Sequence, residues 1–221
     1  MMRNLTDRVT YILNECKGKR VLHLGCTDWP WTEDRIKNGL LLHPKLNAAA
    51  SFLVGMDADP AGVDAFRKLG FSETYVDNVE VFSNPAICRD KFDVIVAGEI
   101  IEHLENPGLF LRGVQKLMTP STELIVTTVN AYCFFRFVYY VLGREDVHPD
   151  HNYYFSPVVL RKLITRCGLE VTDFKHYAIG REIRPLCPRK ILLLDDISRL
   201  LFPHASDGVI FKARLPRPPA R

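Results

Sequence analysis

The stretch Phe92–Pro107 reads FDVIVAGEIIEHLENP, a buried run that turns polar in a single step. Residues 92–98 are mostly apolar, with valine and isoleucine prominent, which predicts a buried strand that ends at a glycine. Two carboxylates and an imidazole follow at once, from Glu99, Glu102 and His103. Side chains with acid–base and metal-binding chemistry at the end of a buried strand indicate that a functional site begins there.

Other apolar runs predict further strands, and segments with helical patterning separate most of them. The further strands are predicted at residues 20–25, 51–57, 72–77, 123–129, 169–179 and 207–215. Helices are predicted at residues 6–18, 59–70, 106–118 and 156–168, three of them with proline at the first helical position. The alternation of strand and helix predicts an α/β protein built on a mostly parallel sheet.

The length and composition of the chain limit the alternatives. With 221 residues, 47% of them hydrophobic, the chain can form one sizeable core. We therefore expect one domain over residues 1–215, with inserts at about 28–48 and 131–155, and a basic, proline-rich tail at 216–221. A net charge of +3 is too small to argue for nucleic-acid binding by itself. The six cysteines form no CxxC pair, and neither a signal peptide nor a transmembrane run is apparent, so we expect a cytoplasmic protein.

The ends of the predicted strands share one kind of chemistry. The first strand ends at Gly25, the second at Asp57, the third at Asp77 and the fourth at Gly98 and Glu99. In open parallel sheets, ligands bind outside these carboxyl ends. A small residue and several acids are therefore predicted along one edge, where a carboxylate such as Asp57 can accept hydrogen bonds from a ribose diol.

This order of features resembles the class I S-adenosylmethionine-dependent methyltransferases over about residues 5–180. The resemblance implies a Rossmann-like, doubly wound, mostly parallel seven-stranded sheet with an antiparallel edge hairpin. It also implies that S-adenosylmethionine is the cofactor, with residues 25–27 facing its amino-acid part, Asp57 its ribose hydroxyls and Asp77 its adenine amine. The full set of cofactor-binding residues expected from the resemblance is Gly25, Cys26, Thr27, Asp28, Asp57, Ala58, Asp77, Asn78 and Glu99.

The chain departs from that family in its first turn. His23 stands where an acid is usual, a second glycine is missing at Thr27 or Asp28, and about a dozen extra residues precede Asp57. Asp28 is expected to take the place of the missing acid beside the methionine ammonium. Two tryptophans at positions 29 and 31 either cover the sulfonium face or simply pack the inserted segment.

Residue types alone leave two interpretations of the group that follows the fourth strand. In a helical turn, Glu99, Glu102 and His103 would lie at i, i+3 and i+4 and share one face toward the site. Alternatively, Glu102 favours the first turn of a helix electrostatically and His103 packs under the sheet edge.

A resemblance to two methyltransferase groups favours a metal site. The ubiquinone-pathway O-methyltransferases and the small-RNA 2′-O-methyltransferases have a similar Glu-x-x-Glu-His at this place, as ligands of a divalent metal. The resemblance implies that Glu99, Glu102, His103 and His151 hold Mg²⁺, Mn²⁺ or Fe²⁺, His151 coming from the HPDH sequence at 148–151. It also implies an acceptor with neighbouring oxygens, such as a diol or a catechol.

Methyl transfer to a hydroxyl also needs a base, because a sugar hydroxyl is a poor nucleophile at neutral pH. The candidate catalytic residues are His151, His148 and His103. A bound metal would lower the pKa of the acceptor hydroxyl, whereas without a metal His151 or His148 would act as a conventional general base. The alternative interpretation of the HPDH sequence is a surface turn held by Pro149, in which both imidazoles are solvated and have no catalytic role.

The leading hypothesis is an S-adenosylmethionine-dependent O-methyltransferase that acts on a hydroxyl of a small molecule or glycan. An RNA 2′-O-methyltransferase and a non-catalytic, cofactor-binding scaffold are the alternatives, although nucleic acid is disfavoured by the weak charge. The aromatic run at 132–145 either covers the acceptor as a lid, contacts a membrane surface, or packs in a homodimer. The role of residues 181–203 stays open.

Overall fold

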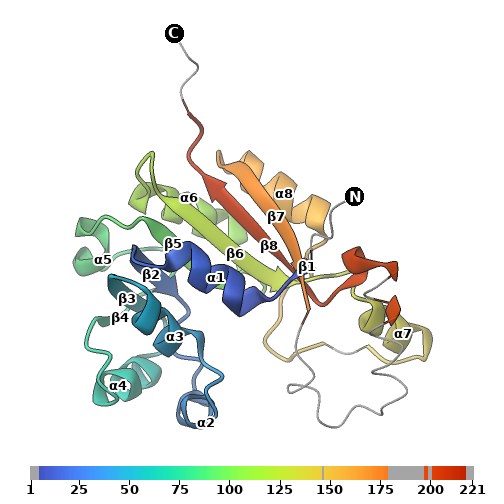
Figure 1. Ribbon diagram of the computed structural model, residues 1–221, viewed down its shortest axis with the longest axis horizontal. Coiled ribbons are helices and arrows are strands. Elements are labelled where there is room, and N and C mark those ends of the chain that lie inside the picture. Colours follow the sequence, from blue (N-terminus) through green and yellow to red (C-terminus); the bar gives the residue numbers. More distant parts are fainter. Residues whose placement is uncertain (1–4, 146, 179–196, 199–200, 218–221) are drawn as a thin grey trace.

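The computed structural model describes residues 5–145, 147–178, 197–198 and 201–217, which form a layered α/β fold (Figure 1). The strands are β1 (Leu5–Thr6), β2 (Arg20–Leu24), β3 (Phe52–Asp57), β4 (Thr74–Val76), β5 (Val94–Gly98), β6 (Glu123–Val129), β7 (Glu170–Tyr177) and β8 (Gly208–Arg214). The helices are α1 (Arg8–Cys16), α2 (Thr32–Lys37), α3 (Leu42–Ala49), α4 (Pro60–Lys68), α5 (Pro85–Arg89), α6 (Pro107–Leu117), α7 (Phe134–Val141) and α8 (Pro157–Arg166), with a 3₁₀ turn at Pro203–Ala205.

All strands belong to one sheet in the order β1-β7-β8-β6-β5-β2-β3-β4. The pairs among β2 to β6 are parallel, and β8 runs antiparallel to both β6 and β7. The mostly parallel, doubly wound sheet with its antiparallel hairpin is thus confirmed. The sheet has one strand more than predicted, because the two residues of β1 pair in parallel with the end of β7.

Side chains of the central strands point alternately to the two faces of the sheet, so that an apolar core layer forms on each face. Leu22 and Leu24 of β2 pack on one face, together with apolar residues of α6 and α8. Val21 of β2 packs on the other face, with Ile12 of α1 and Leu46 of α3. Because successive side chains of a strand point to opposite faces, five residues of β2 are enough to anchor helices on both sides of the sheet.

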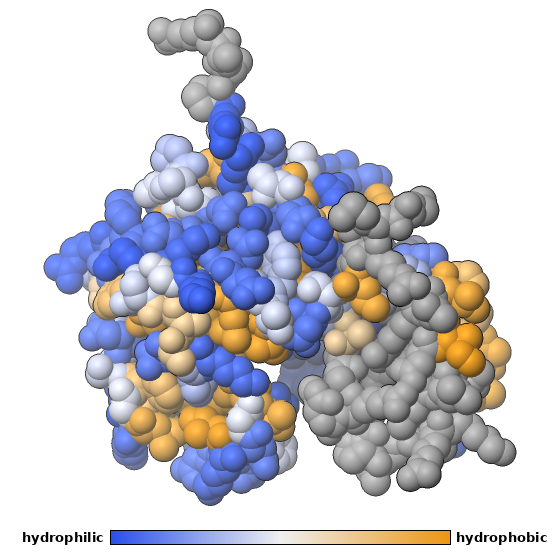
Figure 2. All heavy atoms as spheres, in the orientation of Figure 1, coloured by the Kyte–Doolittle hydropathy of each residue, from blue (hydrophilic) through white to orange (hydrophobic). Residues whose placement is uncertain are grey.

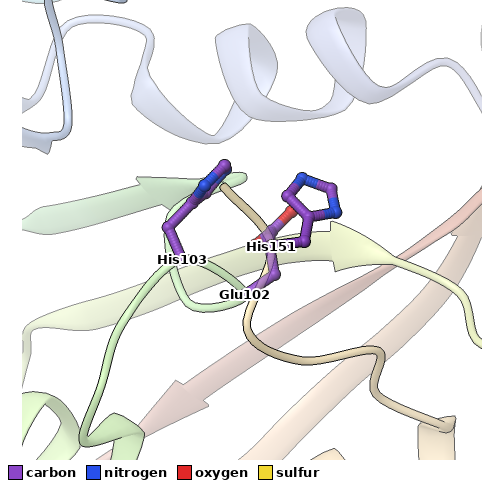
Figure 3. A group of neighbouring side chains, drawn as sticks. All are labelled: Glu102, His103 and His151. Atoms are coloured by element: carbon purple, nitrogen blue, oxygen red, sulfur yellow. The ribbon is translucent and has the colours of Figure 1, made fainter. Parts of the chain in front are cut away.

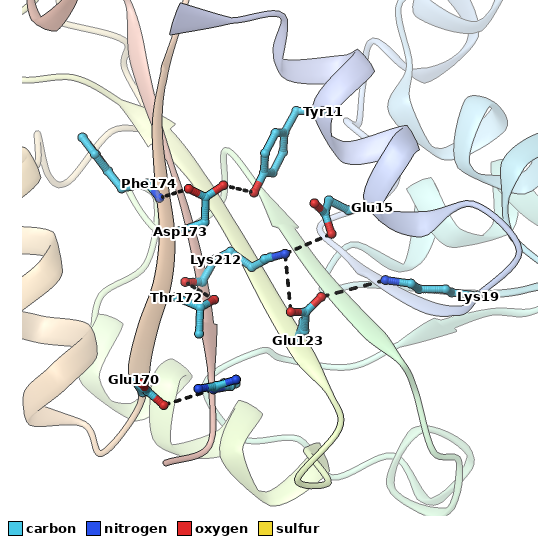
Figure 4. A network of polar contacts seen from close by, with 10 residues as sticks. Tyr11, Glu15, Lys19, Glu123, Glu170, Thr172, Asp173, Phe174 and Lys212 are labelled. Atoms are coloured by element: carbon cyan, nitrogen blue, oxygen red, sulfur yellow. Dashed lines mark hydrogen bonds and ion pairs between the residues drawn. The ribbon is translucent and has the colours of Figure 1, made fainter. Parts of the chain in front are cut away.

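A polar network fastens α1 to the antiparallel end of the sheet (Figure 4). The Lys212 ammonium on β8 lies 3.1 Å from a Glu15 carboxylate oxygen on α1 and 3.4 Å from one of Glu123 on β6. The Tyr11 hydroxyl donates to the Asp173 carboxylate on β7 at 2.8 Å. These contacts set the position of α1, whose first residue, Arg8, reaches the functional edge.

The helix starts expected from the sequence are formed, with one difference. Asp59 accepts from the backbone N–H groups of Ala61 and Gly62, at 2.8 and 3.0 Å, and so caps α4. Asn106 precedes α6 but makes no side-chain cap; instead a Glu80 oxygen accepts from the backbone N–H groups before that helix, at 2.9 and 3.1 Å. Helices α2, α3, α5 and α7 were not predicted as separate elements.

Several expectations concern residues that the structure does not describe. Most of the segment 181–203 and the last four residues of the predicted tail lie outside the described residues. The five described cysteines are free thiols. No helix in the described part of the chain has the length and apolarity needed to cross a bilayer.

Candidate functional site

The ends of β5, β2, β3 and β4 lie side by side, because these strands are neighbours in the sheet and run parallel. Gly25, Asp57, Asp77 and Glu99 each follow or close one of these strands. The predicted edge with one glycine and several acids is therefore formed.

The first turn after β2 is tied to the end of β3 through one carboxylate. Asp57 accepts from the backbone N–H of Thr27 at 2.9 Å and from that of Asp59 at 3.1 Å. Gly25 has a φ of +66°, a conformation that glycine adopts without strain. The Cys26 side chain packs with Leu41 and Phe66, so only the backbone of Cys26 is available to a ligand at this edge.

Asp28, expected beside the methionine ammonium, forms an ion pair within the insert. One of its carboxylate oxygens lies 2.6 Å from the Arg35 guanidinium of α2. Trp29 and Trp31 are 43% and 61% exposed, so neither is a core residue of the inserted segment. The cofactor roles of all three side chains remain predictions.

Asp77 is buried and organises the loop before α5. Its carboxylate accepts from the backbone N–H groups of Asn78 and Asn84 and from the Ser83 hydroxyl, at 2.8 to 2.9 Å. The Asn78 side chain is exposed and accepts from the backbone N–H of Glu80. The adenine contact predicted for Asp77 therefore has to share a carboxylate that already holds the loop.

His23, the departure within β2, has a structural partner in the insert. Its Nδ1 lies 3.2 Å from the Nδ1 of His43 on α3, the two rings are stacked, and both side chains are buried. Burial lowers the pKa of His43 to about 4 and that of His23 well below the usual value. Both rings are thus neutral, one donating to the other, and His23 faces the core.

No helix begins at Glu99, so the interpretation in which Glu99, Glu102 and His103 share one helical face does not describe this turn. Residues 101–103 form a non-helical turn in which the backbone N–H of His103 donates to the Ile100 carbonyl at 3.0 Å. Glu99 has a φ of +57°, and its carboxylate accepts from the Tyr177 hydroxyl. The positive φ turns Glu99 away from the direction that a helix would give it.

Three of the four predicted metal ligands nevertheless converge. One ligand atom each of Glu102, His103 and His151 lies within 4.8 Å of the others (Figure 3). Glu99 stays outside this group. The group joins the turn after β5 to a loop almost fifty residues later, which brings the EIIEH and HPDH motifs together.

Glu102 is the most unusual member of the group. It is fully buried, and neither carboxylate oxygen makes a hydrogen bond of good geometry in the described part of the chain, although the Thr128 hydroxyl and the backbone N–H groups of Glu102 and Val129 lie near enough to lower its pKa. Burial, followed by the nearby Glu99 charge, raises the pKa of Glu102 to about 8. A buried carboxylate that lacks well-formed hydrogen bonds is costly, and a bound cation would offset that cost.

The imidazoles of the site are oriented for binding. The Nδ1 of His103 lies 3.0 Å from the Asp150 carbonyl, so this nitrogen donates and Nε2 is left as the acceptor. The Nδ1 of His151 is buried and has no partner in the described chain. Burial, with the neighbouring His103 and His148, lowers the pKa of His151 to about 4. His148 lies at the exposed side, with its ring tilted against that of His151 and the two ring centres 4.8 Å apart.

Two residues that sequence reasoning missed hold this loop in place. The backbone N–H groups of Asn152 and Tyr153 donate to the Glu102 carbonyl at 2.8 and 3.1 Å. The Asn152 side-chain amide also donates to the His103 carbonyl at 2.8 Å. Both residues follow HPDH directly, but only the long-range contacts identify them as positioning residues.

Arg8 is a third residue that the sequence did not single out. Its guanidinium donates to the Thr127 hydroxyl at 3.2 Å and lies 5.8 Å from the centre of the Tyr177 ring. Burial opposes its charge, but Glu99 and Tyr177 outweigh that effect and raise its pKa. Arg8 therefore offsets the charge of Glu99 at the same edge.

The donor set fits a divalent cation. It offers one buried carboxylate and two imidazoles, a mixture of oxygen and nitrogen ligands that suits Mn²⁺ or Fe²⁺. A small turn at Gly25 beside an acid at the end of β3 likewise fits a nucleoside cofactor at this edge.

Comparison with known proteins identifies the family of the chain. The family model of the methyltransferase domain matches residues 1–173. The ubiquinone biosynthesis O-methyltransferase of Azorhizobium caulinodans is 32% identical over 180 residues, which cover 73% of this chain. The chain spans 62% of the length of that relative.

Solved structures share the fold at low sequence identity. A SAM-dependent methyltransferase from Archaeoglobus fulgidus superposes with a TM-score of 0.61 at 14% identity, covering 94% of this chain and 91% of that one. The small RNA methyltransferase HEN1 gives a TM-score of 0.61 at 18% identity, covering 97% of this chain and 25% of that one. With the strand order, the acids at the strand ends and the matching family model, the chain belongs to the methyltransferase-domain family of class I S-adenosylmethionine-dependent methyltransferases.

Proposed function

We propose that the chain is an O-methyltransferase whose acceptor offers two neighbouring hydroxyls to a divalent cation. The observation that supports this most strongly is Glu102, a fully buried carboxylate without a well-formed hydrogen bond in the described chain, next to His103 and His151. Structural carboxylates at such depth are normally hydrogen-bonded. A divalent cation held by these residues would supply that partner and would chelate the two hydroxyls of the acceptor.

The proposed roles follow from the positions of the side chains. Glu102, His103 and His151 hold the cation, and Glu99 stands close enough to act on Glu102 electrostatically. When bound, the cation would lower the pKa of the reacting hydroxyl and fix its direction. His148, exposed beside His151, is placed to take the proton from the acceptor.

The cofactor is proposed to lie along the ends of β2, β3 and β4. The turn at Gly25, Cys26 and Thr27 would receive its amino-acid part, and Asp57, with Ala58, its ribose. Both oxygens of Asp57 already accept one backbone N–H, which orients the carboxylate for a diol. With the cofactor bound in this way, we expect its methyl group to lie between the first turn and the Glu102 group.

The proposal also extends to the class of molecule that carries the acceptor hydroxyls. The HEN1 likeness, at 18% identity, concerns the fold, and the weak net charge of +3 does not favour RNA. A small molecule or glycan is the preferred acceptor class.

The first test is a calorimetric titration of Mn²⁺ into the protein saturated with S-adenosylhomocysteine. We expect one ion to bind per chain and Glu102→Gln to abolish binding, because the neutral amide is a poor ligand. Glu105→Gln is the matched control, since it removes the same charge at an exposed position three residues later. Equal Mn²⁺ affinity in wild type and Glu102→Gln, or no binding in the wild type, would contradict the proposal.

A further inference from the structure

A cavity of about 400 Å³ lies against α7, within the size range of small-molecule sites. Its lining includes four aromatic rings and two charged side chains: Tyr132, Phe137, Tyr140, Tyr154, Arg136 and Glu145. It adjoins the Glu102 group, because the Tyr154 ring centre is 5.5 Å from that of His151. A ligand in this cavity therefore lies next to the proposed metal site.

The aromatic side chains of the cavity are exposed to an unusual degree. Tyr132, Phe137 and Tyr140 are each more than 60% exposed, although they stand on one short segment. Figure 2 shows hydrophobic side chains at the margin of the molecule where α7 lies. Phe135 on the same helix is buried and anchors it, so the exposed rings are not needed for packing α7. Exposed apolar rings around a cavity mark a binding surface.

The charged side chains of the cavity select among possible ligands. The Arg136 guanidinium lies over the Tyr154 ring, 4.9 Å from its centre, and one of its nitrogens donates to the Asn130 carbonyl at 3.3 Å. Its Nε is buried and has no hydrogen-bond partner among the described residues. Glu145 lines the same cavity, is exposed and forms no ion pair with Arg136, so the cavity offers its carboxylate as an acceptor and the Arg136 guanidinium as a donor.

We infer that this cavity binds a sugar ring and that the acceptor is therefore a glycan or glycoside; this inference rests on the proposed function, whose acceptor it names. A sugar has apolar ring faces that pack on Tyr140 and its neighbours. Its hydroxyls both donate and accept, so they satisfy Glu145 and Arg136 together.

Two other ligand classes fit the lining less well. An anionic ligand would be attracted by Arg136 but repelled by Glu145, which lines the same cavity. A catechol would pack on the rings, but it would use both hydroxyls at the cation and leave Arg136 and Glu145 without partners. A ring that carries hydroxyls at several positions can serve both the cation and the cavity.

The test measures sugar binding directly, without methyl transfer. Saturation-transfer NMR with a panel of methyl glycosides, supported by a glycan array, is expected to detect binding to the wild-type protein. Tyr140→Ala and Glu145→Gln are exposed positions and are expected to weaken binding roughly tenfold, through the lost ring contact and the lost acceptor. Leu142→Ala, which is exposed on the same segment but does not line the cavity, is the control and should bind as the wild type does.

The outcomes separate this inference from the proposed function. Binding of 3,4-dihydroxybenzyl alcohol with no binding of any glycoside would overturn the sugar inference and leave the metal-assisted function standing. Equal glycoside affinity in Tyr140→Ala and Leu142→Ala would also overturn it, because the sugar would then bind elsewhere. Glycoside binding that depends on Tyr140, in a protein that binds no Mn²⁺, would support the sugar site and refute the metal-assisted function.

Discussion

Two groups of histidines in this molecule share a residue type but differ in how their ring nitrogens are satisfied. His23 and His43 are buried and pair with each other, Nδ1 to Nδ1 at 3.2 Å. His103 and His151 meet the buried Glu102 carboxylate. In the first group the two Nδ1 atoms satisfy each other, whereas in the second the Glu102 oxygens and the His151 Nδ1 make no well-formed hydrogen bond in the described chain.

The comparison teaches that burial alone does not distinguish a structural imidazole from a functional one. Burial lowers the pKa of His43 and of His151 alike, to about 4 in both. What differs is the partner: an imidazole in one case, and a carboxylate in the other. If the two groups differ in this way, variants of His43 should change the stability of the fold, and variants of His151 should change metal affinity.

The largest expected effect is on metal affinity, from a change in the group formed by Glu102, His103 and His151. His151→Gln should lower Mn²⁺ affinity more than about 100-fold, because it removes a ligand rather than a supporting contact. Calorimetric titration measures this, and His43→Gln should leave the affinity unchanged. A similar loss of affinity in both variants would show that the separation is wrong.

A change in the His23–His43 pair should instead lower the stability of the fold. His43→Ala leaves the Nδ1 of His23 buried without its partner and opens space between α3 and β2, which should lower the free energy of unfolding by about 2 to 4 kcal/mol. Urea denaturation gives this value. His148→Ala, at an exposed position, should change it little. An unaltered midpoint in His43→Ala would contradict the structural role of the pair.

The same pair makes the fold sensitive to acid. The pKa of His43 is about 4 in the folded protein, below the value of about 6.5 in the unfolded chain. Between these values the unfolded chain binds more protons, so the free energy of unfolding falls as the pH drops from about 6.5 toward 4, by at most about 1.4 kcal/mol per pH unit for each such histidine. Urea midpoints measured from pH 7 to 4.5 should decline less steeply in His43→Gln. Parallel curves for the two proteins would refute this.

A smaller effect is expected from the loop that carries His151. Asn152→Ala removes the side-chain amide that donates to the His103 carbonyl, so the ligands should be held less firmly. Mn²⁺ affinity should fall about tenfold, the lower range for residues that support metal ligands. Tyr153→Phe, which loses only the hydroxyl contact to the Glu105 carbonyl, is the comparison. Equal affinity in Asn152→Ala and wild type would mean that the loop positions its ligands without the amide.

The smallest effect concerns Asp28 in the insert that also carries His43. Its ion pair with Arg35 is more than one-third exposed on both sides, so Asp28→Asn should cost less than about 1 kcal/mol of stability. If Asp28 instead holds the cofactor ammonium, S-adenosylhomocysteine affinity will fall by far more than stability does. Measuring both in one variant decides between the two roles of this carboxylate.

The sequence predicted the sheet and the motifs well, because both depend on local patterns. The seven predicted strands and the caps at Asp59 and Ser156 are present, since burial and capping leave marks within a few residues. The sequence left a helical turn at Glu99 as one of two interpretations, and it gave no sign of the positive φ or of the contact with Tyr177, a residue 78 positions later. The partner of His23 was missed because it lies twenty residues away, in an insert without a strong helical pattern.

The sequence by itself determined the α/β architecture, the acids at the strand ends and the two motifs that carry the candidate chemistry, since periodicity and strand-end residues are local properties. The tertiary structure decided which of those residues meet. In the fold, Glu102 and His103 lie beside His151, and Glu99 contacts Tyr177 near Arg8. His23 pairs with His43. Such pairings depend on where distant segments cross the sheet edge, and no spacing along the chain encodes that crossing.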